Sequence, residues 1–287
     1  MALLLLAQAA LGDRCHAATV DHGLRDASAA EACWVADQCG ARGIRHVTLT
    51  GTLPGRVGPT ANLSARARAL RYRLLEDARV SIGATAIATA HHADDQLETV
   101  VMRLNRGGGV RGLAGVRARA GRVIRPLLGW SRADLAAIVA ATGIEPIVDP
   151  SNVDDRFDRA RLRKSLAGAD WLDPAGAAAS AAALADADAA LDWTAASLAA
   201  RCCRFGDGEA RCQPPADLPF ELQRRLVALC LAHVEPAIAC RGDALARAAR
   251  ALAAGQTAML GNTQATLSGP AGAPVWHFRR APPRRSA

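Results

Sequence analysis

Strand signals alternate with helix signals through the first half of this 287-residue chain, and this alternation limits the possible folds more than any other feature. Short apolar or β-branched runs occupy residues 15–20, 44–49, 84–90 and 123–128. Amphipathic helical segments lie before, between and after them, at 3–11, 28–40, 63–80, 94–105 and 131–142. Strands separated by helices of this length form parallel β-α-β units. We therefore predict an α/β fold with a doubly wound, mostly parallel sheet that binds ligands at the carboxyl ends of its strands.

The second half of the chain changes character, which predicts a second domain. Asp173-Pro174 is a typical helix start, and a helix could continue from there to about Arg204. Two further helices and a hairpin are predicted at 219–234, at 243–254 and around Gly261-Asn262. We predict a catalytic domain at 1–168 and a smaller, mainly helical domain with a short β tail at 169–287.

The net charge of +8, from 35 basic and 27 acidic side chains, is unevenly distributed. Residues 101–164 hold 13 basic and 6 acidic side chains, and residues 241–287 hold 7 and 1. Between them, residues 165–240 hold 5 basic and 10 acidic side chains. Basic blocks of this kind are typical of proteins that bind phosphate groups, above all nucleic acids. A solvated arginine-rich surface would have the same composition.

The cysteines and the apolar runs do not indicate a metal ribbon, a disulfide framework or a membrane span. No two of the eight cysteines have C-x-x-C spacing, so a zinc ribbon or an iron–sulfur site is not expected and free thiols are favoured. No run approaches the ~20 apolar residues of a transmembrane helix. The opening leucine run lacks the preceding basic residues of a secretion signal. We therefore expect a cytoplasmic protein that does not act on membranes.

An acidic segment at 91–99, His-His-Ala-Asp-Asp-Gln-Leu-Glu-Thr, lies at a predicted strand-to-helix junction. Asp94 and Asp95 are four and three residues before Glu98, so the three carboxylates share one helix face. They suit Mg²⁺, which takes one or two carboxylates together with substrate phosphates. They equally suit helix capping, because Asp95 and Glu98 have capping-box spacing and acids favour helix N-termini. The adjacent histidines could pack in the core, and zinc is the weakest alternative because no third ligand stands at metal spacing.

Three other segments carry polar patterns near predicted turns. Thr-Val-Asp-His-Gly-Leu-Arg at 19–25 directly follows a strand. Arg-Gly-Gly-Gly-Val-Arg-Gly-Leu at 106–113 could form an anion nest or a glycine-rich turn without a ligand. Asp-Pro-Ser-Asn at 149–152 is a turn by composition. The helix face after it suits phosphate contact or solvent equally well, and it carries Arg156, Arg159 and Arg163.

Taken together, in this order and spacing, these segments resemble the N-terminal catalytic domain of the tRNA(Ile)-lysidine synthetase (synthase) family, which belongs to the PP-loop ATP pyrophosphatases. The resemblance covers about residues 1–166 and rests on 19–25, 67–72, 91–99, 106–115, 125–128 and 149–152. It implies ATP and Mg²⁺ as cofactors. It also implies that ATP adenylates the C2 oxygen of the wobble cytidine in the CAU anticodon of tRNA(Ile). The ε-amine of L-lysine then displaces AMP.

The resemblance implies roles for the residues at matching positions. The catalytic residues would be His92, Asp94, Asp95 and Glu98, and the Mg²⁺ ligands would be Asp94 and Glu98. The nucleotide pocket would be lined by Asp21 and His22. Phosphates of ATP or RNA would be contacted by Arg111 and Arg163. The second domain would contact tRNA.

The chain departs from the family pattern in two places. The family opens with S-G-G-x-D-S, a glycine-rich loop whose N–H groups hold pyrophosphate at a helix N-terminus, and this chain has no such segment. Residues 1–11 resemble the helix after that loop, so we expect the first strand and the loop to be absent and ATP binding to be weak. Ala160 stands where the family's R-N-R run usually has Asn.

Two other functions stay open on this basis. One is a PP-loop tRNA 2-thiolation enzyme, which the lack of C-x-x-C disfavours. The other is a tRNA-binding remnant that has kept the fold without catalysis.

Overall fold

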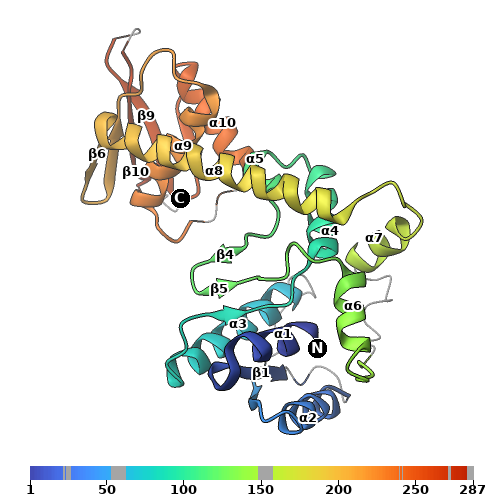
Figure 1. Cartoon of the computed structure of the whole chain (residues 1–287). Helices are drawn as coiled ribbons and strands as arrows, with labels where there is room; N and C mark the ends of the chain where they lie inside the picture. The colour runs from blue at the N-terminus through green and yellow to red at the C-terminus, as the bar shows by residue number, and fades with distance from the viewer. Residues whose placement is uncertain are drawn as a thin grey trace. The chain divides into compact units, whose positions relative to one another are not determined.

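The computed structural model describes residues 1–21, 23, 27–52, 63–147, 158–238, 240, 242–270 and 273–282. They form two compact units, Met1–Ala185 and Asp186–Ala287, which follow the colour bar of Figure 1 from blue to yellow and from yellow to red. The division falls inside the long helix α8 (Pro174–Cys202), on the C-terminal side of the predicted boundary at residue 168. Among the described residues, no helix has both the length and the apolar character that a membrane crossing needs.

The first unit begins with a parallel β-α-β arrangement. Helix α1 (Ala2–Leu11) precedes strand β1 (His16–Asp21), and helix α2 (Ala27–Gly40) connects β1 to strand β2 (Arg45–Thr50). The strands pair in parallel, with His16 opposite Arg45 and Asp21 opposite Thr50. The strands predicted at 15–20 and 44–49 are confirmed, and so is the helix between them.

A three-stranded sheet follows, in the order β3-β5-β4. Strand β3 (Ile87–Ala88) is parallel to β5 (Val123–Ile124), and β4 (Arg119–Ala120) is antiparallel to β5. These strands are shorter than the runs predicted at 84–90 and 123–128. The Arg125 N–H donates to the Ala118 carbonyl at 2.9 Å and continues the β4–β5 ladder by one residue, but Pro126 has no N–H with which to extend β5 further. Among the described residues, this sheet and the β1–β2 pair are separate.

Helices pack around these strands (Figure 1). They are α3 (Leu63–Ser81), α4 (Ala93–Leu104), α5 (Val110–Leu113), α6 (Arg132–Ala140) and α7 (Asp158–Leu166). An apolar cluster joins α1 to α6 and is built from Ala2, Leu127, Leu135, Val139 and Ile144. Because α6 starts close to the end of β5, this packing fixes where its N-terminus lies.

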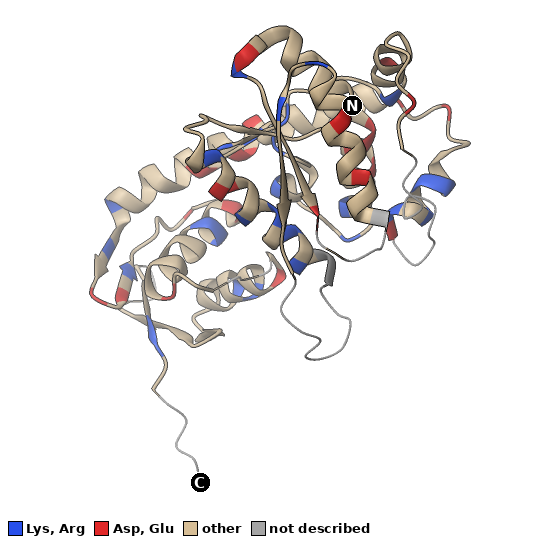
Figure 2. Cartoon of the chain, turned by 90° about the horizontal axis from the view of Figure 1, so that it is seen from below, with Lys and Arg blue, Asp and Glu red and all other residues tan. Residues whose placement is uncertain are grey.

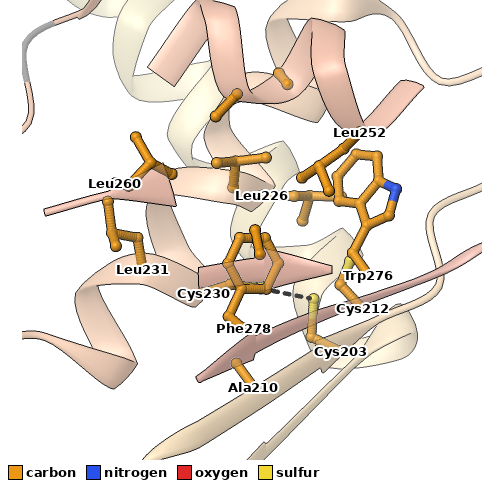
Figure 3. Packing of buried hydrophobic residues seen from close by; sticks show 14 of the residues in the cluster. Cys203, Ala210, Cys212, Leu226, Cys230, Leu231, Leu252, Leu260, Trp276 and Phe278 are labelled. Carbon is orange, nitrogen blue, oxygen red and sulfur yellow. Dashed lines mark hydrogen bonds between the residues drawn. The ribbon is translucent and has the colours of Figure 1, made fainter. Parts of the chain in front are cut away.

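The second unit packs helices against a five-stranded antiparallel sheet of order β6-β7-β10-β9-β8. The strands are β6 (Cys203–Gly206), β7 (Glu209–Cys212), β8 (Ala258–Leu260), β9 (Thr263–Ser268) and β10 (Val275–Arg280). The helices are the C-terminal part of α8, α9 (Phe220–Val234) and α10 (Gly242–Ala253). The core between them includes Leu226, Leu252, Trp276 and Phe278, which point toward one another in Figure 3.

The helices of the second unit and its β8–β9 hairpin match the sequence prediction, but the β6–β7 hairpin was not predicted. It turns at Asp207-Gly208, where Gly208 has a φ of 69°. An Asp-Gly pair between two short strands is a strong hairpin signal, because both turn residues tolerate positive φ. The unit therefore contains more strand than the predicted β tail.

Candidate active site

The acidic segment lies at the start of α4, directly after β3. Helix α4 begins at Ala93, with His92 as its N-cap residue, and the His92 backbone N–H donates to the Asp95 carboxylate at 3.2 Å. The cap is therefore formed by His92 and Asp95, so the predicted Asp95–Glu98 capping box is wrong by one helical turn. A capping role for Asp95 leaves its other oxygen able to make a further contact.

Glu98 is buried and holds an arginine from another helix. It is 3% exposed, and its two oxygens accept hydrogen bonds from Nε and Nη2 of Arg163 on α7 at 2.5 and 3.2 Å. The same guanidinium reaches the Asp95 carboxylate at 3.4 Å. The hydrogen bond to Glu98 is the main reason that the pKa of Arg163 is raised. The structure thus brings together three predicted site residues from two helices 65 residues apart in the chain.

Asp94 points toward the N-terminus of α6. Its Oδ2 accepts the backbone N–H of Arg132 at 2.7 Å and lies 3.4 Å from Nδ1 of His92. A helix N-terminus attracts negative charge because its first N–H groups are unpaired. The Asp94 side chain is 28% exposed, against 4% for Glu98, so it is the more accessible of the two predicted Mg²⁺ ligands.

Arg132 is a site residue that the sequence analysis missed. Besides its backbone contact with Asp94, its Nη2 lies 3.6 Å from the Glu98 carboxylate. Ser131 caps α6 by accepting the Asp134 N–H at 3.1 Å, which fixes this helix start. Part of the signal was available, because Ser131 is a typical helix cap and follows the strand predicted at 123–128. No strand order was predicted, and it is the parallel pairing of β5 with β3 that places both carboxyl ends at one edge of the sheet.

The glycine-rich segment is tied to α4 by two more residues that the sequence analysis missed. Arg103 Nη1 donates to the carbonyls of Gly112 and Gly115 at 2.7 and 2.9 Å. Gln96 both donates to and accepts from the backbone of Val116. Gly115 has a φ of 61°, and a Cβ there would lie 2.4 Å from the Gln96 amide oxygen, so this position requires glycine. Arg111, predicted to meet phosphate, lies on α5 within this anchored segment.

Other predicted residues are placed elsewhere or lie outside the described residues. Asp21 ends β1 and accepts hydrogen bonds from the Gly23 N–H at 2.8 Å and the Ser28 hydroxyl at 2.6 Å. Arg159, on the predicted phosphate-binding face, donates to the Thr99 hydroxyl at 3.1 Å and so faces α4. His22, Arg156 and the segment 149–152 lie outside the described residues.

A cavity of about 360 Å³ lies beside the acidic segment. Its wall is mostly apolar and comes from α1, α6 and the residues after β3 and β5, with His92 and Arg132 as its polar members. Because His92 follows β3, the cavity is at the carboxyl end of that strand, where doubly wound sheets bind ligands. Among the described site residues that were predicted, His92 alone is in its wall, and the others are not: Asp21, Asp94, Asp95, Glu98, Arg111 and Arg163.

The burial of the His91 side chain makes the stability of the protein depend on pH. Burial lowers the pKa of His91 to about 4, below its model-compound value of 6.5, and its Nδ1 contacts the Thr89 hydroxyl at 3.0 Å. The unfolded chain therefore binds a proton that the folded chain does not, so stability is lost as pH falls from about 6.5 toward 4. After allowance for partial solvent exposure, we expect His91 to account for about 1 kcal/mol of that loss by pH ~5.

Urea unfolding of the parent protein and of His91→Gln at several pH values measures this difference. The parent should lose more free energy of unfolding on acidification than the variant does. Parallel curves for the two proteins would contradict the burial of a neutral His91.

Comparison with known proteins identifies the family. The PP-loop domain model matches residues 1–169. A tRNA(Ile)-lysidine synthase from Novosphingobium aromaticivorans is 45% identical over 99% of this chain and 86% of its own length. One from Zymomonas mobilis is 37% identical over 100% of this chain and 87% of its own length. Among solved structures, a U34-tRNA thiolase, NcsA from Methanococcus maripaludis, matches 57% of this chain and 59% of its own with 17% identity and a TM-score of 0.45. With a PP-loop domain over more than half of its length and near-full-length relatives of one kind, the chain belongs to the tRNA(Ile)-lysidine synthases of the PP-loop family.

Proposed function

We propose that this protein forms lysidine in tRNA(Ile) at the expense of ATP. The C2 oxygen of the wobble cytidine attacks the α-phosphorus of ATP, which releases pyrophosphate and leaves an adenylated base. The ε-amine of lysine then adds at C2, AMP leaves with the C2 oxygen, and the amine gives up a proton. The observation that carries the proposal is the near-full-length match to tRNA(Ile)-lysidine synthases, together with a carboxylate cluster at the carboxyl end of β3.

In this proposal the acids of α4 have different roles, which depend on how accessible each carboxylate is. Asp94 and Asp95 attract the lysine ammonium and accept the proton that its amine loses, because carboxylates near the cavity serve as general bases. His92 holds the start of the helix and lines the cavity. Glu98 is too deeply buried to meet the substrate first, and it positions the guanidiniums of Arg163 and Arg132.

The residues fit Mg²⁺ in part. Asp94 has a partly exposed carboxylate next to His92 and Arg132, which line the cavity, and this suits an ion that takes one or two protein oxygens and the phosphates of ATP. Both oxygens of Glu98 accept hydrogen bonds from Arg163, so Asp94 is the better candidate ligand of the predicted pair. When bound, Mg²⁺ would neutralise charge on the phosphates. Asp21, His22 and Arg111 remain candidates for contacts with ATP, and the cytoplasm is the expected place of action because tRNA is modified there.

Incorporation of labelled lysine into tRNA tests the proposed function. We expect ATP-dependent incorporation into a tRNA(Ile) with a CAU anticodon, with AMP and pyrophosphate formed alongside it. A tRNA(Ile) variant with uridine at the wobble position is the matched control and should accept no lysine. If the protein binds tRNA but forms neither lysidine nor AMP when ATP is added, the proposed enzyme activity is wrong. The hypothesis of a tRNA-binding remnant without catalysis would then be favoured.

The basic block at 101–164 is proposed to follow the RNA backbone. Lys and Arg are spread over many elements of the ribbon (Figure 2), and α7 carries several of them, including the exposed Arg161 and Lys164. Replacing both by Gln should weaken tRNA binding similarly for different tRNA species, because phosphate contacts position RNA without reading its sequence. The logarithm of the binding constant falls as the logarithm of the salt concentration rises, and each lost contact should make this slope shallower by about 0.7 to 0.9.

Filter binding at several salt concentrations measures that slope. The matched control replaces Arg14 and Arg45, which are exposed and lie outside the block, by Gln. It removes the same charge and should leave the slope nearly unchanged. Equal changes of the slope in the two double variants would show that binding depends only on the overall charge. That result would contradict a contact between α7 and the RNA backbone.

A further inference from the structure

Four cysteines of the second unit converge, although none of them has C-x-x-C spacing. Cys202 ends α8, Cys203 begins β6, Cys212 ends β7 and Cys230 lies on α9. Cys203 and Cys212 are directly opposite each other in the β6–β7 pair. Figure 3 shows Cys203, Cys212 and Cys230 side by side in the core, with a dashed line between Cys203 and Cys230. The cluster is thus assembled by the hairpin and the helix that packs on it.

Three spacings between the sulfur atoms match those around a single tetrahedral metal ion. The Sγ atoms lie 4.0 Å apart for Cys202 and Cys203, 3.8 Å for Cys202 and Cys212, and 3.9 Å for Cys203 and Cys230. The ligand atoms of Cys202, Cys203 and Cys212 are all within 4.8 Å of one another, and Cys230 lies outside this mutual set and adjoins it through Cys203. A zinc–sulfur bond of about 2.3 Å places tetrahedral ligands about 3.8 Å apart. Clusters of several iron atoms hold their cysteines further apart than a single ion does.

The surroundings are those of a closed site. Cys212 and Cys230 are fully buried and Cys203 is 4% exposed, so a metal there would be shielded from solvent as in structural sites. Arg204 and Arg211 are the sequence neighbours of Cys203 and Cys212 and lie opposite each other across β6 and β7. Because successive strand residues point to opposite faces, these exposed arginines lie on the other face of the hairpin, where Arg211 pairs with Glu209 at 3.2 Å. The inference therefore depends on the spacing and burial of the sulfur atoms.

We infer that Cys202, Cys203, Cys212 and Cys230 bind one zinc ion. A set of four soft thiolate ligands selects zinc among the common divalent metals. All four positions are protein ligands, so the site is closed and its role is structural: it fastens the end of α8 and the middle of α9 to the β6–β7 edge of the sheet. The spacing argument against a zinc ribbon stands, because this site is formed by tertiary contacts and not by a local motif.

Metal analysis of the full chain, purified without chelator and with zinc in the growth medium, tests this inference. We expect about one zinc per chain. Cys212→Ser and Cys230→Ser should lose most of it, and the matched control Cys240→Ser should keep it, since Cys240 is in the same unit but outside the cluster. Replacing zinc by Co²⁺ should give the intense visible absorption of a tetrahedral tetrathiolate in the parent and in Cys240→Ser only.

Thiol titration of the same unfolded samples separates the alternatives. Eight titratable thiols after zinc release support the site, because all eight cysteines are free. Zinc-free protein with eight thiols would overturn the inference in favour of cysteines packed as small apolar residues. Zinc-free protein with six thiols would overturn it in favour of a disulfide, for which Cys203 and Cys212 are the cross-strand neighbours. Because the parent protein itself decides among these outcomes, misfolding of a variant does not affect the test.

Discussion

Replacement of Glu98 by Gln is expected to lower ATP-dependent lysine incorporation into tRNA(Ile) by at least about a hundredfold. The amide keeps the size of the side chain but removes the charge that holds Arg163 through two hydrogen bonds and attracts Arg132. The Arg163 guanidinium, which already reaches Asp95 at 3.4 Å, would then move closer to it, and that of Arg132 could move toward Asp94. Both acids are proposed to meet lysine. The measurement is the initial rate of lysine incorporation at saturating tRNA and ATP.

Glu76→Gln is the matched control for this prediction. Glu76 also accepts hydrogen bonds from Nε and Nη2 of one arginine, Arg79, at 2.9 and 2.7 Å. That pair lies within α3 and its carboxylate is 45% exposed, so its loss should have little effect on stability and leave the rate unchanged. If Glu98→Gln retains a near-normal rate and only melts at a lower temperature, Glu98 serves helix packing alone.

Asp94→Asn separates charge from structure at the same site. An Asn oxygen can still accept the Arg132 N–H that Asp94 accepts at 2.7 Å, so the start of α6 should be preserved. The negative charge proposed to attract lysine or Mg²⁺ is lost, and incorporation should fall as far as in Glu98→Gln. A helix-capping role would instead predict a stability loss of about 1 kcal/mol with turnover spared.

The sequence predicted the elements of this site better than the contacts between them. The position of α4 after a strand, the helix α8 and the β8–β9 hairpin follow from local periodicity, caps and turn residues, which are encoded by neighbours in the chain. The pairing of Glu98 with Arg163 joins residues 65 apart. No local pattern encodes it, because it depends on how α7 packs on α4.

The cysteine cluster was not predicted from the sequence because it, too, depends on contacts between residues that are far apart in the chain. The expectation that metal sites show C-x-x-C spacing describes ligands on one local turn. Cys230 comes from α9 and reaches Cys203 only when that helix packs on the hairpin. The Asp207-Gly208 turn, by contrast, is a local hairpin signal that the sequence analysis did not use. Without this hairpin, the prediction did not place Cys203 opposite Cys212.

Replacement of Arg225 by Met is expected to destabilise the second unit by about 3–5 kcal/mol. Arg225, on α9, is a 5% exposed guanidinium that contacts three acids: Asp188 at 2.6 Å, Asp192 at 2.5 Å and Glu221 at 2.8 Å. Asp188 is itself 4% exposed, so the variant removes the buried cation that this interior carboxylate contacts at 2.6 Å. Removing one partner of a buried ion pair costs more than the pair contributes, because the remaining charge cannot be solvated. Chemical denaturation followed by circular dichroism measures the loss.

Two further variants distinguish this cause from a general loss of packing. Arg224→Met removes the neighbouring arginine. Its side chain is 23% exposed and, of the three acids, pairs only with Glu221, at 2.7 Å. This variant should therefore lose less than about 1 kcal/mol of unfolding free energy. The double replacement Arg225→Met with Asp188→Leu removes both buried charges and should recover most of the stability lost in Arg225→Met, because apolar side chains of similar volume carry no desolvation cost. If the double variant is less stable than Arg225→Met, the network holds α8 to α9 through its geometry, and the desolvation argument fails for this unit.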